Sequence, residues 1–321
     1  MSFNRREFFA GTALAGAATA LPFSLTSAVA QEAAAGQAPA FHRVKVGDAA
    51  VTGIADGHLA LNASVFPDAS EEEFAAAMEA AFLPPEAYTA PVNAYLVQSG
   101  GSTTLIDAGG STQMAPTLGK LTANLEAAGV APGDINTILI THLHPDHIGG
   151  LMAGGGVAFP DTEVKVREEE VAFWTDPATR AAMPEGFRPM VDGVVAMLEA
   201  YGDQVTRFSA DGEMAPGIEA VFLPGHTPGH TGFRVGSGDD ALLIWGDVVH
   251  AAPLQMPNPR QYIGFDTDGE QAVKTRLELL DQVATDRLPV AGMHMPFPGF
   301  GHIAPRGEGF EFVVLPWQYG G

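Results

Sequence analysis

Short runs of apolar residues, separated by polar or glycine-containing turns, recur along most of this chain and predict buried strands. Early in the sequence we expect strands at 44–46, 50–56, 92–98 and 103–107. Later apolar runs predict further strands, which we place at 135–140, 218–223, 242–245 and 288–291.

Other segments carry apolar residues at helical spacing, and we expect helices at 71–82, 118–128 and 268–283. Strands that alternate with helices in this way indicate an α/β protein. The chain is long enough to bury one sizeable core, and two packed sheets covered by helices would use it fully.

The segment 175–207 is rich in proline, methionine and aromatic residues, among them Met183, Phe187, Met190 and Met197. These side chains fit two interpretations. They could form a helical lid or pocket wall that admits apolar substrates, or they could be ordinary core-facing residues.

The first thirty residues have the composition of an export signal. Arg5 and Arg6 precede a stretch of small apolar residues, and an Ala-Val-Ala cleavage site ends at residue 30. We expect a twin-arginine-type signal peptide at 1–30, a flexible leader at 31–40 and a folded domain at 41–321. The apolar stretch is too short for a stable membrane anchor. Export in the folded state by the twin-arginine (Tat) machinery would place the protein in a bacterial periplasm or outside the cell.

Charge and cysteine content narrow the possible functions. The formal net charge is −22, from 16 Lys and Arg against 38 Asp and Glu. Such an acidic surface argues against nucleic-acid binding, because contacts to a phosphate backbone need a basic face. The sequence has no cysteine, which excludes disulfides, cysteine-ligated metal sites and a cysteine nucleophile.

The densest chemistry directly follows the strand expected at 135–140, where the sequence reads His-Leu-His-Pro-Asp-His. Imidazole and carboxylate are common ligands of zinc and similar divalent metals. Residues i and i+2 of an extended segment point to the same side, so His142 and His144 can bind one ion while Asp146 and His147 face a second. A polar surface loop with coincidental histidines is the alternative, but this density of ligands favours a metal site.

Three downstream segments also place possible ligands directly after apolar strands. They read Pro-Gly-His-Thr-Pro-Gly-His at 224–230, Trp-Gly-Asp at 245–247 and Gly-Met-His-Met-Pro-Phe-Pro-Gly at 292–299. Dispersed ligands converge when their strands end at the same edge of a sheet.

Taken in order, these motifs resemble those of the metallo-β-lactamase superfamily, over about 44–314. The resemblance implies an αββα sandwich with two mixed sheets flanked by helices. It also implies two divalent metal ions, for which we expect zinc and keep manganese, cobalt and iron as alternatives. Carried over residue by residue, one ion would be bound by His142, His144 and His226, the other by Asp146, His147 and His294, with Asp247 bridging the two.

Within the superfamily the motifs look most like the exported methyl parathion hydrolase group, whose relatives include lactonases and arylesterases. This likeness implies a homodimeric hydrolase of esters, lactones or phosphotriesters with an apolar or aryl group. Trp174 resembles the leaving-group pocket tryptophan of that group. Its organophosphate specialist has an aromatic residue in the segment where this chain has Met114, which argues against efficient phosphotriesterase activity. We expect Phe297 and Phe300, beside His294, to line the pocket entrance.

The expected mechanism uses a hydroxide that bridges the two metals and attacks the carbonyl carbon or phosphorus. Asp247 or Asp146 can take up the proton. His250 stands where related lactonases have a tyrosine, and it is either a proton donor or oxyanion stabiliser, or a structural histidine.

Two further residues are expected to orient metal ligands through hydrogen bonds. We expect Asp107 to orient His142, and His230 to orient His226 or Asp247. His42, His58 and His302 receive no role.

A β-lactamase or a glyoxalase-II-like thioesterase on the same fold is the main alternative function. The basic residues that would bind the carboxylates of those substrates are not obvious near the motifs. A di-iron redox protein on this fold would carry glutamate where this chain has His144, and a non-catalytic binding module would be expected to lose ligands.

Overall fold

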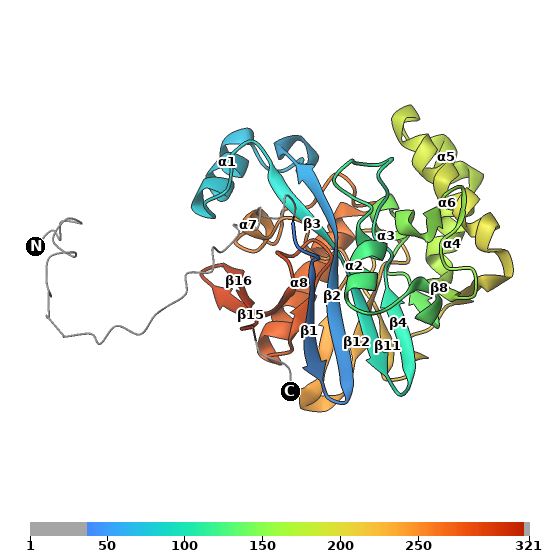
Figure 1. The fold of residues 1–321 in the computed structure, drawn as a ribbon. Coiled ribbons are helices and arrows are strands. Elements are labelled where there is room, and N and C mark those ends of the chain that lie inside the picture. Colours follow the sequence, from blue (N-terminus) through green and yellow to red (C-terminus); the bar gives the residue numbers. More distant parts are fainter. Residues whose placement is uncertain (1–36, 318–321) are drawn as a thin grey trace, which may run out of the picture. The chain divides into compact units, whose positions relative to one another are not determined.

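Two seven-stranded sheets lie face to face in residues 37–317, the part of the chain that the computed structural model describes (Figure 1). The signal peptide predicted at 1–30 and residues 31–36 of the predicted leader lie outside this range.

The first sheet has the order β1-β2-β3-β4-β5-β8-β9, with strands at Phe41–Val46, Ala49–Leu61, Tyr88–Ser99, Ser102–Ile106, Thr137–Leu139, Glu163–Arg167 and Val205–Phe208. The second runs from β10 to β16 in sequence order, with strands at Glu213–Ala215, Ile218–Phe222, Thr231–Val235, Leu242–Ile244, Val290–Ala291, Phe300–Arg306 and Gly309–Val314. A small separate hairpin joins β6 (Met152–Ala153) to β7 (Gly156–Val157).

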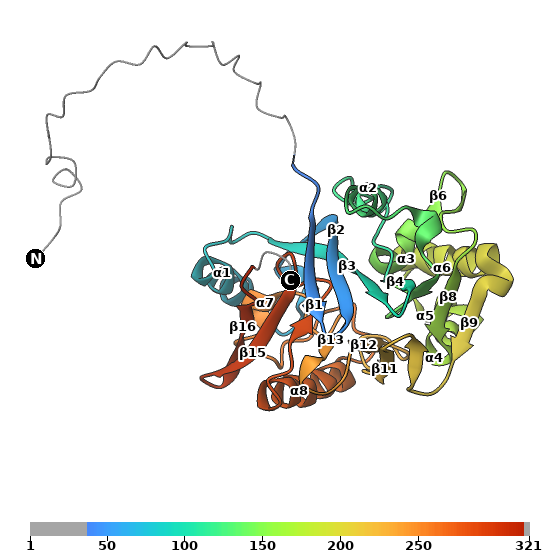
Figure 2. The same cartoon turned by 60° about the horizontal axis from the view of Figure 1, so that its bottom comes forward.

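Helices cover the outer faces of both sheets, as Figure 2 shows for α8 on one side and for α2, α3 and α6 on the other. The α-helices in the described residues are α1 (Glu71–Ala80), α2 (Leu121–Ala127), α3 (Pro145–Ile148), α4 (Glu168–Thr175), α5 (Pro177–Ala182), α6 (Arg188–Tyr201), α7 (Ala252–Gln255) and α8 (Gly269–Thr285).

Separate groups of buried apolar residues hold these layers together. Tyr95 and Ile106 of the first sheet pack with Phe233 and Ile244 of the second, which makes the core between the sheets. Another group joins the first sheet to α2, α4 and α6, and a third joins the second sheet to α8. The predicted αββα sandwich with two mixed sheets is confirmed.

Each strand and helix predicted from the apolar pattern is present, and the differences are at element ends. The helix predicted to reach residue 82 ends at Ala80, because Phe82 adopts a left-handed backbone with φ 60°. The helix predicted from residue 118 begins at Leu121, after Gly119 with φ 80°. The first two strands are longer than the apolar runs that predicted them.

The topology brings the carboxyl ends of several strands to one edge of the sandwich. Strands β4, β5 and β8 run parallel, so the segments that follow them lie together. Strands β13 and β14 of the second sheet are also parallel, and β11 has the same direction because antiparallel β12 lies between β11 and β13. Each histidine or aspartate motif found in the sequence follows one of these strands.

The carboxylate of Asp56, buried in β2, holds the segment after β4 against the start of α2. It accepts backbone N–H bonds from Gly110 at 3.0 Å, Gly119 at 3.0 Å and Leu121 at 2.9 Å. No feature of the sequence had marked this residue.

Replacing Asp56 with alanine should lower the free energy of unfolding by about 3 kcal/mol, because two buried N–H groups and one partly buried N–H group lose their acceptor. Urea unfolding would measure this change, with the exposed Asp48→Ala as the matched control. A loss no larger than that of the control would show that water replaces the carboxylate without cost.

Among the described residues, no helix is both long and apolar enough to cross a membrane.

Candidate metal centre

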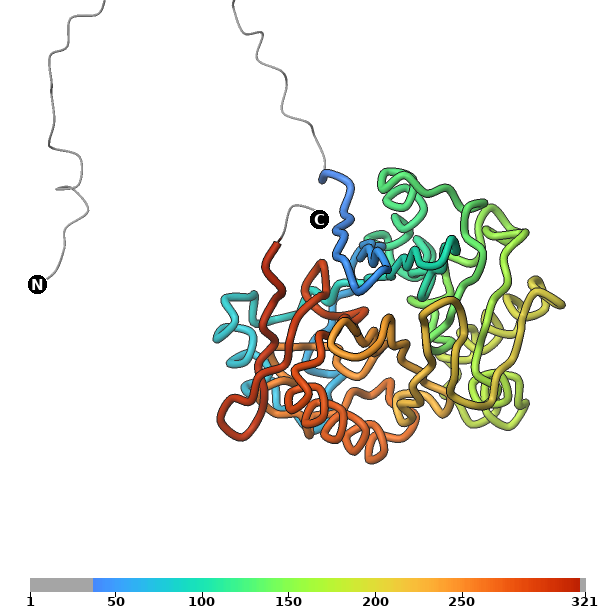
Figure 3. Tube along the Cα trace, turned by 90° about the horizontal axis from the view of Figure 1, so that it is seen from below, coloured from blue at the N-terminus to red at the C-terminus, as the bar shows by residue number. Residues whose placement is uncertain are grey.

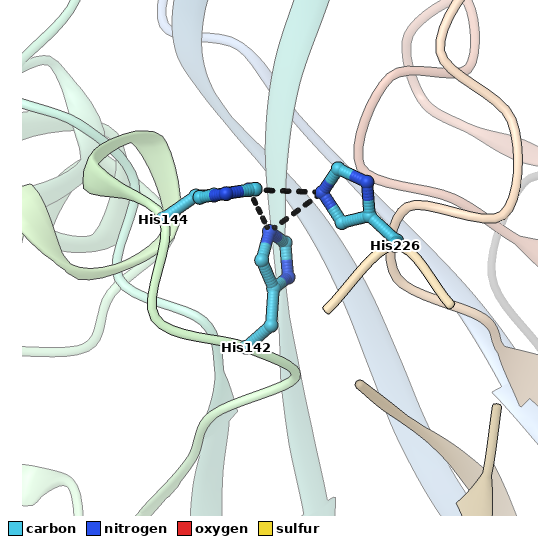
Figure 4. A group of neighbouring side chains, drawn as sticks. All are labelled: His142, His144 and His226. Carbon is cyan, nitrogen blue, oxygen red and sulfur yellow. Dashed lines mark hydrogen bonds between the residues drawn. The ribbon is translucent and has the colours of Figure 1, made fainter. Parts of the chain in front are cut away.

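Three histidines from two loops point their ring nitrogens toward one another (Figure 4). His142 and His144 lie between β5 and α3, and His226 follows β11. His142 Nε2 lies 3.0 Å from His144 Nδ1, His144 Nδ1 lies 2.9 Å from His226 Nε2, and His226 Nε2 lies 3.2 Å from His142 Nε2. A triangle of this size lets one ion contact all three nitrogens at zinc–nitrogen distances of about 2.0–2.1 Å.

A second group of ligand atoms lies beside the first. It consists of Asp146 and His147 in α3 and His294 after β14. The Asp146 carboxylate lies 3.6 Å from His147 Nε2 and 3.4 Å from His294 Nε2. All three residues are buried.

Asp247, directly after β13, lies between the two groups. Its Oδ2 is 3.1 Å from His294 Nε2 and 3.3 Å from His147 Nε2, on the side of the second group. The same oxygen is 3.5 Å from His226 Nε2 and 3.7 Å from His142 Nε2, on the side of the first. The structure thus brings together all seven ligands that the sequence motifs suggested, with Asp247 in the bridging position.

Unpaired polar atoms at this centre indicate that the residues fit metal ions. His147 Nε2 and Asp247 Oδ1 are buried and have no hydrogen-bond partner. The opposite ring nitrogens of three ligands are engaged: His147 Nδ1 lies 2.6 Å from Asp107, His226 Nδ1 lies 2.7 Å from Asp266, and His294 Nδ1 lies 2.7 Å from the Pro91 carbonyl. Metal-binding histidines are oriented in this way, with one nitrogen held and the other facing the ion.

The electrostatics of the centre favour the binding of cations. Burial holds the pKa values of His142 and His144 well below the usual value, so both rings are neutral and suited to metal binding. Burial also acts on His147 and His294, but neighbouring carboxylates outweigh it, and they raise the pKa of His294 to about 10. Divalent cations would take the place of the protons that these two rings hold.

Asp107 corrects one prediction, because its carboxylate contacts His147 and not His142. It also accepts from Thr141, from the backbone N at 2.8 Å and from Oγ1 at 2.7 Å, and Thr141 Oγ1 in turn lies 3.1 Å from His142 Nδ1. Asp107 has φ 59°, a left-handed backbone that aspartate tolerates better than most residues.

His230 supports Asp247, one of the two ligands proposed for it. Its Nδ1 donates to the Leu223 carbonyl at 2.7 Å, so its Nε2 is the acceptor for the Asp247 backbone N–H at 2.9 Å. Burial lowers the pKa of His230 to about 3, which keeps the ring in this neutral form.

Two supporting carboxylates were missed by sequence reasoning. Asp266 holds His226 although forty residues separate them, and Glu170 contacts both histidine loops. Neither residue stands in a local motif, so only their arrangement in space reveals these roles.

A cavity of about 560 Å³ opens onto the metal centre. One wall comes from α4 to α6, which lie at the opposite end of the fold from the β15–β16 hairpin (Figure 3). Most of its lining side chains are apolar: Leu59, Ala60, Leu61, Ala90, Met114, Phe173, Trp174, Met183, Pro184, Phe187, Met190 and Phe265. Asp146, Asp247, His144, His226, His250 and His294 line it on the metal side.

The structure places the four predicted pocket residues in two different regions. Met114 and Trp174 line the cavity. Phe300 does not, because it is buried between the sheets, where its ring packs against Tyr95 at 5.4 Å. Phe297 is partly exposed and also lies outside the residues that line the cavity. Phe300 was placed wrongly at the entrance, since nearness to His294 in sequence does not fix the direction of a side chain.

The segment 175–207 combines its two predicted roles. Met183, Phe187 and Met190 line the cavity, whereas Met197 is buried in the core against the first sheet.

Comparison with known proteins agrees with this fold. The model of the metallo-beta-lactamase superfamily matches residues 87–294. The chain is 28% identical over 198 residues to uncharacterized protein YobT of Bacillus subtilis (strain 168), covering 60% of this chain and 79% of YobT. It is 29% identical over 204 residues to the N-acyl homoserine lactonase AiiB of Agrobacterium fabrum, covering 55% of this chain and 71% of AiiB. The chain spans about half the length of several Bacillus N-acyl homoserine lactonases. With the Bacillus cereus enzyme it shares 23% identity over 152 residues, which cover 46% of this chain and 52% of that enzyme.

Solved structures extend the likeness to nearly the whole described chain. Hydrolase AbOPH of the beta lactamase superfamily superposes with a TM-score of 0.82 at 28% identity, covering 88% of this chain and 100% of AbOPH. AidC, a dizinc quorum-quenching lactonase, shares the fold with a TM-score of 0.82 at 24% identity, covering 87% of this chain and 99% of AidC. Because the family match spans more than half of the chain and the shared fold spans most of it, the protein belongs to the metallo-beta-lactamase superfamily and is a metal-dependent hydrolase.

Proposed function

We propose that this protein uses a dinuclear metal centre to hydrolyse uncharged lactones and esters that carry an apolar or aryl group. The observation that carries the proposal is the position of the metal centre on one side of an otherwise apolar cavity, which five of the seven ligands line. A reacting carbonyl group can sit at the metal side while the rest of the substrate contacts apolar side chains.

The charge of the cavity supports an uncharged substrate. Among the described residues that line it, none is lysine or arginine. A substrate carboxylate would therefore enter without a basic side chain to bind it, beside the carboxylates of Asp146 and Asp247. This argues against the alternative functions, because β-lactams and glutathione thioesters both carry carboxylates.

His142, His144 and His226 would hold one ion, and Asp146, His147 and His294 the other, with Asp247 shared. When bound, two divalent cations make a water molecule acidic enough to act as hydroxide near neutral pH and polarise the acyl oxygen.

The side chains of the chain supply the remaining chemistry. Attack by water on the carbonyl carbon forms one C–O bond, and the proton of the water passes to a carboxylate oxygen. The same carboxylate then gives this proton to the alkoxide oxygen as its bond to the carbonyl carbon breaks. We assign this transfer to Asp247, whose Oδ2 lies 3.1 Å from His294 Nε2 and whose second carboxylate oxygen, Oδ1, is buried at the same centre. Trp174 and Phe173 in α4 provide an aromatic wall for the apolar part of the substrate.

His250 is positioned to donate a hydrogen bond to substrate oxygen. Gln255 of α7 accepts the backbone N–H of His250 at 2.7 Å, the ring Nε2 lies 3.1 Å from Asp247 Oδ2, and the ring Nδ1 is buried without a hydrogen-bond partner. Burial lowers the pKa of His250 to about 4, so near neutral pH the ring is uncharged and carries one N–H donor. The ring lines the cavity beside Asp247 and His294.

Replacing His250 with phenylalanine should lower kcat about 100-fold when compared at equal metal content, because the donor to the substrate is lost. Steady-state kinetics with metal analysis would measure both quantities, with His302→Phe on β15 as the control. A kcat equal to that of the control would assign His250 a structural role.

The proposal is tested with a panel of substrates on the metal-loaded protein: acyl-homoserine lactones, p-nitrophenyl esters, a dialkyl aryl phosphotriester and the β-lactam nitrocefin. The relatives named as N-acyl homoserine lactonases support the lactone arm. We expect turnover of the lactones and aryl esters and little turnover of the phosphotriester. Turnover of nitrocefin alone would overturn the proposed substrate class.

A further inference from the structure

We propose that Glu170 is a positioning residue that ties both histidine loops of the metal centre to Trp174 in the cavity wall. Glu170 lies in α4, is not one of the seven ligands and does not line the cavity. The inference rests on the proposed function and deepens it, because it names the residue that fixes the metal-ligand loops relative to the cavity wall.

The carboxylate of Glu170 contacts three separate parts of the site. Its Oε1 accepts the backbone N–H of Leu143 at 2.9 Å and the indole N–H of Trp174 at 2.7 Å. Its Oε2 accepts the backbone N–H of Gly229 at 3.0 Å. Leu143 lies between His142 and His144 in the chain, and Gly229 lies directly before His230 in the loop that carries His226.

Because Glu170 is buried, its carboxylate depends on these hydrogen bonds. Its side chain is fully buried, and none of the ion pairs in residues 37–317 involves it. A buried carboxylate without a cation is costly unless hydrogen-bond donors surround it. Burial raises the pKa of Glu170, and the three N–H donors act against that rise.

The packing around Glu170 leaves little freedom in the second loop. A Cβ at Gly229 would lie 2.4 Å from the Glu170 backbone nitrogen, so the loop approaches α4 as closely as only glycine allows. Close packing against α4 therefore explains why the residue before His230 is glycine, which the sequence motif alone did not explain.

Trp174 connects this arrangement to the substrate. Its ring lies edge-on to His144, with centroids 5.5 Å apart, and it also lines the cavity. A change at Glu170 would therefore move two ligand loops and one cavity wall together.

The test compares Glu170→Gln with the adjacent, exposed Glu169→Gln in the full-length protein. Glutamine keeps the shape but replaces one acceptor oxygen by an NH₂ group, which would face an N–H donor. We expect the affinity for Zn²⁺, measured by competition with a chromophoric chelator, to fall about 10–100-fold. We also expect a changed visible spectrum of the Co²⁺-loaded protein and a raised KM for an aryl ester.

Two outcomes overturn the proposal. One is a folded Glu170→Gln protein, judged by circular dichroism, with the Zn²⁺ affinity, Co²⁺ spectrum and KM of the Glu169→Gln control. If Glu170→Gln does not fold, Glu170→Asp carries the test, because it keeps the charge but shortens the side chain that reaches Leu143 and Gly229. We then expect a Zn²⁺ affinity below that of Glu169→Asp, and an equal affinity would be the second overturning outcome.

Failure of the proposed function gives a different result. If the wild-type protein hydrolyses none of the lactones and esters, the Zn²⁺ affinity and the Co²⁺ spectrum still report on Glu170, because neither measurement needs a substrate.

Discussion

Replacing Asp247 with alanine should lower the rate of hydrolysis by about 1,000-fold or more, the largest effect that we expect from a single substitution. The Asp247 Oδ2 atom lies within 3.7 Å of ring nitrogens in both ligand groups, and its Oδ1 is unpaired. The substitution would therefore remove a ligand shared by the two groups and the acceptor that we assign to the proton.

The measurement is kcat/KM for an aryl ester or a lactone, with bound metal determined on the same samples. Asp239→Ala is the matched control, since this exposed aspartate lies in the turn between β12 and β13. Activity of Asp247→Ala close to that of the control, at equal metal content, would refute the bridging role.

Removing metal with a strong chelator should abolish hydrolysis and also lower the thermal stability of the protein. The centre buries two carboxylates, Asp146 and Asp247, close to the rings of His147 and His294. Without cations, the negative charge of the carboxylates is balanced by protons on these two rings. Metal that binds only the folded state contributes its binding free energy to stability, so its removal lowers Tm.

Activity and Tm should both return when Zn²⁺ is added back, whereas Mg²⁺ should restore little, because a site rich in imidazole suits zinc better than magnesium. Calorimetry and a kinetic assay on the same apo preparation would show this. Undiminished activity after complete metal removal would be incompatible with the proposed chemistry.

The layers of the fold could be predicted because the apolar pattern is local. Each run that predicted a strand is a strand, and Leu121 and Leu125 of α2 face the core as their spacing indicated. The element ends were less predictable, since they depend on single backbone angles such as the φ of 60° at Phe82.

The ligands could be predicted from local motifs together with the resemblance to the metallo-β-lactamase superfamily, which implied the full set. His142, His144, Asp146 and His147 lie in one short run, and the later ligands each follow an apolar strand. The topology of parallel strands then brings such positions to one edge.

The supporting residues depend on long-range packing, which a single sequence does not reveal. Asp266 reaches His226 from the segment before α8, and Glu170 reaches two loops from α4. The same reason explains the error at Phe300, which follows the His294 segment but turns inward, where its ring packs between the sheets.

The most direct test of a dinuclear metal-dependent hydrolase is a titration of the metal-free protein with Zn²⁺, with bound metal and ester or lactone hydrolysis measured at each step. We predict that hydrolysis rises with occupancy and reaches its maximum at two ions per chain, as expected for two adjoining ligand groups that share Asp247. A maximum at one ion per chain, or hydrolysis that does not depend on bound metal, would contradict the account.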